Sequence, residues 1–99
     1  MRVFFHIPGP LRAFAEGNAQ VRVEGSAATL REALLLLWQA HPGLRDRVVT
    51  ESGELREHVN LFVGNESIRY AEGLSTGISD GAEVSIIPAI SGGWNQLGS

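Results

Sequence analysis

The side chains in this 99-residue sequence that could bind a metal or attack a substrate are few and scattered. Three histidines, His6, His41 and His58, show no ligand-like spacing, and the sequence contains no cysteine. Without cysteine there is no disulfide framework, thiolate nucleophile, thiolate zinc site or iron–sulfur cluster. We therefore expect no bound metal and no cysteine chemistry.

The carboxylates and glycines also show no catalytic pattern. Glu51, Glu54 and Glu57 lie at helix-like spacing in a polar stretch, where nothing apolar would shift a pKa, so a solvated surface is the favoured interpretation. Serine, threonine and histidine form no nucleophile motif, and no phosphate-binding glycine loop opens a helix. A domain of this size also has few residues to spare for an enclosed pocket, so we do not expect a self-contained enzyme.

The number and distribution of charged residues indicate which kinds of binding partner are disfavoured. There are 8 basic and 11 acidic residues, giving a net charge of -3, and every basic residue is an arginine. The arginines are spread from Arg2 to Arg69 without a basic run, which disfavours nucleic acid as a partner. The N-terminal apolar stretch is interrupted by His6 and stopped by Pro8, so it is interpreted as a strand, not a signal peptide. We expect no membrane span and a cytoplasmic location.

Hydrophobic periodicity predicts the elements that must carry these side chains. Alternating apolar and polar residues predict strands over residues 2–7, 20–24, 59–63 and 84–87, with a short strand at 68–70. One main helix is predicted between the N-cap Thr29, with Glu32 completing a capping box, and the stop at His41. Residues 11–16 and 51–57 are predicted loops, and residues 44–49 a short helical turn.

The order strand, strand, helix, strand, short strand, strand predicts an α+β protein with a β-grasp fold, a mixed sheet wrapped around one main helix. Residues 1–90 would form this domain, and residues 91–99 a flexible C-terminal tail containing Gly92-Gly93 and a removable extension, 94–99. The helix covers one face of such a sheet and leaves the other face open.

Three apolar residues are predicted to point toward the open face. Phe4, Phe62 and Ile87 are out of phase with the core positions, and in a β-grasp their three strands lie side by side. We expect them to meet at one level and form a partner-docking patch. The alternative is that each is a scattered surface hydrophobe.

A Gly-Gly pair directly follows the last predicted strand. With this pair, the chain resembles the ThiS/MoaD family of ubiquitin-like sulfur carriers, and within it the CysO-type carriers of cysteine synthesis. The resemblance spans residues 1–93. The stretches that carry it are Ile7-Pro8, Leu11-Arg12, His58 to Val63, Ile68 to Tyr70, Asp80-Gly81 and Val84 to Gly93.

The resemblance implies a carrier without a catalytic site or a bound cofactor. An E1-like adenylyltransferase would use ATP to adenylate the Gly93 carboxylate, which would then become a thiocarboxylate. Ser91, Gly92 and Gly93 would form the C-terminal arm, slim enough at its glycine tip to enter a narrow channel. A cysteine-synthase-type enzyme would be a sulfur acceptor, although related carriers serve other sulfur-containing metabolites.

Residues Trp94 to Ser99 depart from this family pattern, because an active carrier ends at the second glycine. We favour a precursor that a peptidase, such as a zinc-dependent JAMM-type enzyme, cleaves between Gly93 and Trp94. Alternatively, the end from Leu97 is a cloning remnant or a deliberate block, or the tail is native and uncut. Two other functions remain open: a ubiquitin-like modifier conjugated through Gly93 to lysines of other proteins, and a non-carrier interaction module.

Overall fold

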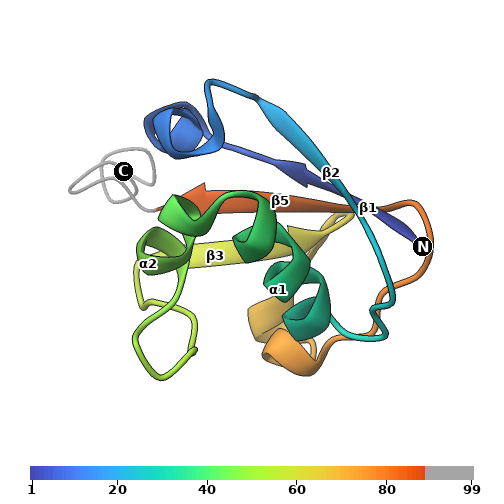
Figure 1. Cartoon of the computed structure of the whole chain (residues 1–99). Coiled ribbons are helices and arrows are strands. Elements are labelled where there is room, and N and C mark those ends of the chain that lie inside the picture. The colour runs from blue at the N-terminus through green and yellow to red at the C-terminus, as the bar shows by residue number, and fades with distance from the viewer. Residues whose placement is uncertain (89–99) are drawn as a thin grey trace.

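A five-stranded mixed sheet forms the body of the molecule in the computed structural model, which describes residues 1–88 (Figure 1). The strands lie in the order β2-β1-β5-β3-β4. Their bounds are β1 Arg2–His6, β2 Gln20–Glu24, β3 Val59–Val63, β4 Glu66–Ser67 and β5 Ala82–Pro88. The α-helices are α1 Leu30–Ala40 and α2 Arg45–Val48, and the 3-10 helices are η1 Gly9–Ala15, η2 Pro42–Leu44, η3 Ile68–Tyr70 and η4 Gly73–Ser75.

The strand pairing confirms the predicted β-grasp. Strand β1 pairs antiparallel with β2 and parallel with β5, and β5 pairs antiparallel with β3. Because β1 and β5 run in the same direction, the chain enters the sheet at one end and leaves β5 at the opposite end (Figure 1). The predicted neighbourhood of the first, third and last long strands is therefore correct.

Helix α1 packs against one face of the sheet, and its start is the capping box that the sequence predicts. The Thr29 side chain accepts a hydrogen bond from the Glu32 N–H, and the Glu32 carboxylate accepts from the Thr29 N–H. These bonds satisfy N–H groups that have no partner within the helix. The helix ends at His41, and the expected short turn after it is α2.

The core lies between α1 and the covered sheet face. Its largest fully buried side chains are Phe5, Ile7, Leu30, Leu37, Leu44, Leu61, Ile68, Ile86, Val3, Val48, Val59 and Val84. Most come from the alternate positions of β1, β3 and β5 and from one side of α1, as the periodicity predicts. Ile7 directly follows β1, and Leu44, Val48 and Ile68 come from η2, α2 and η3. The opposite sheet face has no covering helix among the described residues.

Two segments differ from the prediction. Residues 68–70 are the 3-10 helix η3, because the strand ends at Ser67 and the Ser67 hydroxyl accepts a hydrogen bond from the Arg69 N–H. The expected loop at 11–16 lies mostly within η1, whose buried Leu11 and Ala15 anchor it to the core. No helix within residues 1–88 is long and apolar enough to cross a membrane.

Candidate functional site

The candidate site surrounds the end of β5, where the described chain stops at Pro88. The C-terminal arm and the cleavage position, Ser91, Gly92, Gly93 and Trp94, lie outside the described residues, as does the predicted boundary between residues 90 and 91. The structure therefore describes the base from which this tail departs.

The three predicted docking residues all lie on the open sheet face and are half-buried. However, the register places them on three successive rows and not at one level. On the adjacent strand, Phe4 is paired with Glu83, Phe62 with Ser85, and Ile87 with Asn60. Successive same-face positions along a strand are about 7 Å apart. Because β5 lies between β1 and β3, the three side chains form a triangle on the face, with Ile87 on the middle strand and furthest along it.

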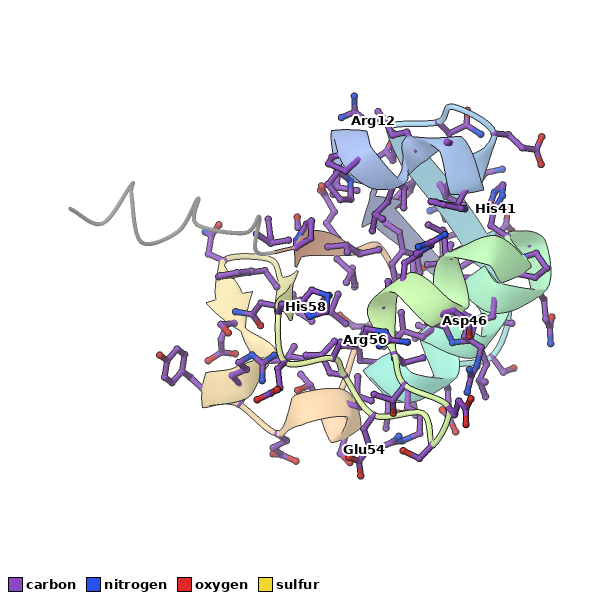
Figure 2. All side chains as sticks on the ribbon, turned by 90° about the vertical axis from the view of Figure 1, so that its left-hand side faces the viewer. Arg12, His41, Asp46, Glu54, Arg56 and His58 are labelled. Atoms are coloured by element: carbon purple, nitrogen blue, oxygen red, sulfur yellow. The ribbon has the colours of Figure 1, made fainter. Side chains whose placement is uncertain are left out.

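Phe62 and Ile87 are the two of these three residues that share a surface hollow. The hollow has a volume of about 260 Å³ and lies beside the last residues of β5. It is lined by Glu57, His58, Val59, Asn60, Phe62, Arg69 and Ile87. Figure 2 shows His58 on the segment that leads into β3. Phe62 and Ile87 therefore offer an apolar surface next to the base of the tail, whereas Phe4 lies outside this hollow.

A polar pair separates Phe4 from Phe62. His6 and Glu83 lie on the open face, and His6 Nε2 is 2.8 Å from Glu83 Oε1. His6 shares its row with Ser85 and Phe62, and Glu83 shares its row with Phe4. The sequence analysis missed this pair, although the period of two already places His6 on the same face as Phe4.

The first residues of β3, which lie next to the hollow, form hydrogen bonds with polar side chains. Asn60 Nδ2 donates to Ser67 Oγ at 2.9 Å, and Arg69 Nη2 donates to the Val59 carbonyl at 2.6 Å. Ser67 is buried, whereas Arg69 is mostly exposed. The sequence analysis missed these residues as well, because their contacts depend on where β4 ends.

The opposite end of the sheet carries a separate electrostatic contact. The backbone N–H of Arg2 donates to Asp80 Oδ1 at 2.7 Å. This hydrogen bond, supported by the charge of the Arg2 side chain, holds the pKa of the Asp80 carboxyl below its ordinary value of 3.8. Because Asp80 is fully exposed at the turn before β5, the contact belongs to the turn and not to the candidate site.

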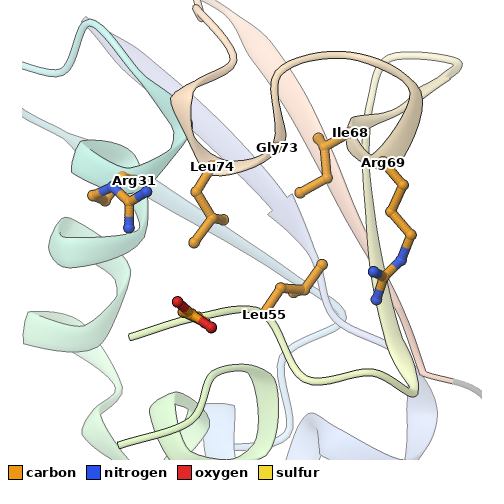
Figure 3. A pocket seen from close by; sticks show the side chains of 7 residues that line it. Arg31, Leu55, Ile68, Arg69, Gly73 and Leu74 are labelled. Atoms are coloured by element: carbon orange, nitrogen blue, oxygen red, sulfur yellow. The ribbon is translucent and has the colours of Figure 1, made fainter. Parts of the chain in front are cut away.

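A second hollow, of about 390 Å³, lies on the helix side of the sheet (Figure 3). Arg31 and Arg69 lie at its two sides, and Leu55 and Leu74 contribute apolar walls. Glu54 also lines it and offsets part of the positive charge. Within residues 1–88 there is no group of three or more histidine, aspartate or glutamate side chains able to hold a metal ion.

Comparison with known proteins agrees with the fold. The ThiS family model matches residues 5–93. Sulfur carrier protein CysO of Mycobacterium tuberculosis is 36% identical over 95 residues, covering 94% of this chain and 100% of that protein. Small archaeal modifier protein 1 of Haloferax volcanii is 37% identical over 78 residues, covering 78% of this chain and 85% of that protein.

A solved structure has the same fold. A chain in the crystal structure of the Amycolatopsis orientalis BexX/CysO complex superimposes with a TM-score of 0.81 at 32% identity, over 89% of this chain and 96% of that chain. The fold and these relatives thus define a small ubiquitin-like carrier protein, of a family that is not itself a catalyst. This chain belongs to the ThiS family and is a CysO-like sulfur carrier of the ThiS/MoaD type.

Proposed function

We propose that this carrier is activated at the carboxylate of Gly93 after residues 94–99 are removed, and that it delivers sulfur for cysteine or another sulfur-containing metabolite. The observation that carries the proposal is the position of Gly92 and Gly93, four and five residues beyond Pro88 at the end of β5, in a chain similar to CysO over nearly its whole length.

The first step would be hydrolysis of the peptide bond between Gly93 and Trp94. Water adds across this bond, leaving a carboxylate on Gly93 and an amino group on the released hexapeptide. A metal-dependent peptidase of the JAMM type would supply this reaction. The step is required because the carbonyl of Gly93 is otherwise held in an amide and offers no carboxylate for activation.

Activation would follow on an E1-like adenylyltransferase that binds ATP in the cytoplasm. A carboxylate oxygen of Gly93 attacks the α-phosphorus of ATP and pyrophosphate leaves. A hydrosulfide-level sulfur donor then attacks the carbonyl carbon, the bond to the AMP oxygen breaks, and AMP leaves, so that a thiocarboxylate remains without a change of oxidation state. A carboxylate is a poor electrophile until it is joined to a good leaving group, so this order of steps explains why a carrier needs a separate enzyme.

The folded domain would provide the surface that this enzyme binds. Phe62 and Ile87 form an apolar surface beside the base of the arm, with Phe4 one row further along the same face. Docking there would hold the arm near the nucleotide and raise its effective concentration at the activating site. A cysteine-synthase-type enzyme would later accept the sulfur.

A second function is favoured by one specific observation, the 37% identity to small archaeal modifier protein 1. The same adenylated Gly93 could be attacked by a lysine amine of another protein, forming an isopeptide bond with release of AMP. The chain contains no lysine of its own, so such conjugates would join its Gly93 to other proteins and not to side chains of a second copy.

Intact mass spectrometry of the untagged protein from its own cells tests the proposal. The expected species lacks residues 94–99 and is about 16 Da heavier than the free acid, because sulfur replaces one carboxylate oxygen. A matched variant, Gly93→Trp, should remain folded and never gain this mass. Detection of only the full chain through Ser99 in every growth condition would overturn the proposal and favour an interaction module, and adducts on lysines would favour the modifier.

A further inference from the structure

Among the described strands, β3 alone pairs with the last residues of β5. Strand β1 pairs with β5 as far as Ser85, where its partner is His6. Beyond Ser85, residues 86–88 pair with Leu61, Asn60 and Val59 of β3. The direction in which the chain leaves the sheet at Pro88 is therefore set by the first half of β3.

Within residues 1–88, this half of β3 has no strand on its other side. Strand β4 pairs only with Phe62 and Val63, so the backbone groups of residues 59–61 that point away from β5 need other partners. The N–H of Leu61 donates to its neighbour Asn60 Oδ1 at 2.8 Å. The Val59 carbonyl accepts from Arg69 Nη2 at 2.6 Å. Side chains thus provide the hydrogen bonds that a neighbouring strand would otherwise supply.

Arg69 also binds the segment that leads into β3. Its Nη2 atom lies within 3.0 Å of the Arg56 carbonyl and 3.2 Å of the Glu57 carbonyl. Figure 3 shows its side chain extending from η3. One guanidinium group therefore joins η3 to three carbonyls around the start of β3, and hydrogen bonds to a charged donor are among the stronger ones in proteins.

The next residue of β3 is held from the same side. Asn60 Nδ2 donates to Ser67 Oγ at 2.9 Å, and the Ser67 hydroxyl lies 3.1 Å from Asn60 Oδ1. Ser67 Oγ also accepts from the backbone N–H of Arg69 at 3.3 Å. Val59 pairs with Pro88, and Asn60 pairs with Ile87. Of these two β3 residues, Val59 is hydrogen-bonded to η3 and Asn60 to β4.

We infer that Arg69 is a positioning residue for the C-terminal arm, acting through Val59 and the first half of β3 on Pro88; this inference rests on the proposed carrier function. Gly93 is five residues beyond Pro88. Five residues span at most about 17 Å, so the region that Gly93 can reach from a docked domain depends on where the end of β5 is held. Misplacement by about 1 Å can slow a reaction about 100-fold.

The kinetic test uses chains ending at Gly93, ATP and an E1-like adenylyltransferase from the same genome, with pyrophosphate release as the readout. Arg69→Met keeps the length and apolar stem of the side chain but removes its donors. We expect kcat to fall at least about tenfold because the end of β5 is displaced. Arg69 also lines the docking hollow, but the apolar surface of Phe62 and Ile87 is retained, so KM should rise by less than kcat falls. The matched control Arg31→Met, on α1, should leave both constants unchanged. An unchanged kcat, or a rise in KM alone, would overturn the inference.

A second measurement needs no partner. Antiparallel alternation makes Asn60 and Ile87 a hydrogen-bonded pair, because Gly64 N–H donates to Glu83 O further along the same ladder. In Arg69→Met, amide hydrogen exchange at Ile87 should become about tenfold faster, while exchange at Ser85, flanked by both β1 and β3, should not change. Equal acceleration at both amides, or none, would overturn the inference.

Ser67→Ala provides a second variant if Arg69→Met does not fold. It removes the partner of Asn60 and should produce the same pattern of exchange, fast at Ile87 and unchanged at Ser85. If the unaltered chain is not adenylated at all, the proposed function fails, whereas the exchange measurement still decides whether Arg69 braces the end of β5.

Discussion

His6 Nε2 and Glu83 Oε1 lie 2.8 Å apart on the open face of the sheet, between Phe4 and Phe62. The His6 and Glu83 side chains are 41% and 62% exposed. An exposed pair of this kind stabilises a fold by at most about 1 kcal/mol. Its greater effect would come in a complex, because a partner that covers the face must either desolvate Glu83 or offer it a cation.

We therefore predict that Glu83→Gln leaves the free energy of unfolding within about 1 kcal/mol of the original chain but weakens the salt dependence of KM for the activating enzyme. The comparison is KM measured at low and high ionic strength. Glu24→Gln, on the edge strand β2 of the same face, is the control. Equal salt dependence of KM in Glu83→Gln and in the original chain would contradict an interaction between the Glu83 charge and the activating enzyme.

Asp80 is predicted to make stability depend on acid pH. Its pKa is lowered in the folded chain, chiefly by the hydrogen bond from the Arg2 N–H. The charged form therefore stabilises the fold at pH values above the ordinary value of 3.8, and this contribution is lost as the pH falls through the lower folded value.

The measurement is the free energy of unfolding of the original chain and of Asp80→Asn as a function of pH. Asparagine keeps an acceptor oxygen but has no charge to lose. The original chain should be the more stable at neutral pH, and the difference between the two should shrink as the pH falls below 3.8. A difference that stays constant down to about pH 2 would exclude this coupling.

The capping box of α1 gives a prediction about stability alone. Glu32 Oε1 accepts from the Ala28 N–H at 2.6 Å and the Thr29 N–H at 3.4 Å, whereas Thr29 Oγ1 accepts from the Glu32 N–H at 3.4 Å. Each replacement by alanine should lower the free energy of unfolding by about 1 kcal/mol, with Glu32→Ala at least as costly as Thr29→Ala. Urea denaturation measures both, and a larger loss for Thr29→Ala would contradict the geometry.

The long elements of this fold could be predicted because each has a strong local signal. Alternation fixed the phase of β1, β3 and β5, and the Thr29 and Glu32 pair marked the start of α1. Residues 68–70 could not be assigned in the same way. A buried Ile68 followed by the exposed Tyr70 fits one turn of 3-10 helix, and a pattern of three residues does not distinguish this from a strand.

The candidate site was only partly predictable for a similar reason. Periodicity placed Phe4, Phe62 and Ile87 on the open face, but their rows depend on the register between strands, which the sequence alone does not specify. The bonds from Arg69 to the start of β3 depend in turn on the early end of β4 at Ser67. Contacts between distant segments thus required the structure.

The register predicts that the two phenylalanines of the open face contribute unequally to docking. Phe62 shares the hollow beside Ile87 and the base of the arm, whereas Phe4 lies one row away, beyond the His6 and Glu83 pair. Phe62→Ala should raise KM for the activating enzyme about fivefold to tenfold, and Phe4→Ala less than about twofold. Both variants should keep kcat, because docking and not the arm is altered.

Steady-state adenylation kinetics with chains ending at Gly93 measures this difference, and thermal unfolding confirms that each variant is folded. Ile87→Ala provides a third variant, which should resemble Phe62→Ala because the two side chains line the same hollow. If Phe4→Ala raised KM as much as Phe62→Ala, the enzyme would have to cover all three apolar residues of the open face. The hollow beside the arm would then not be the centre of the interface.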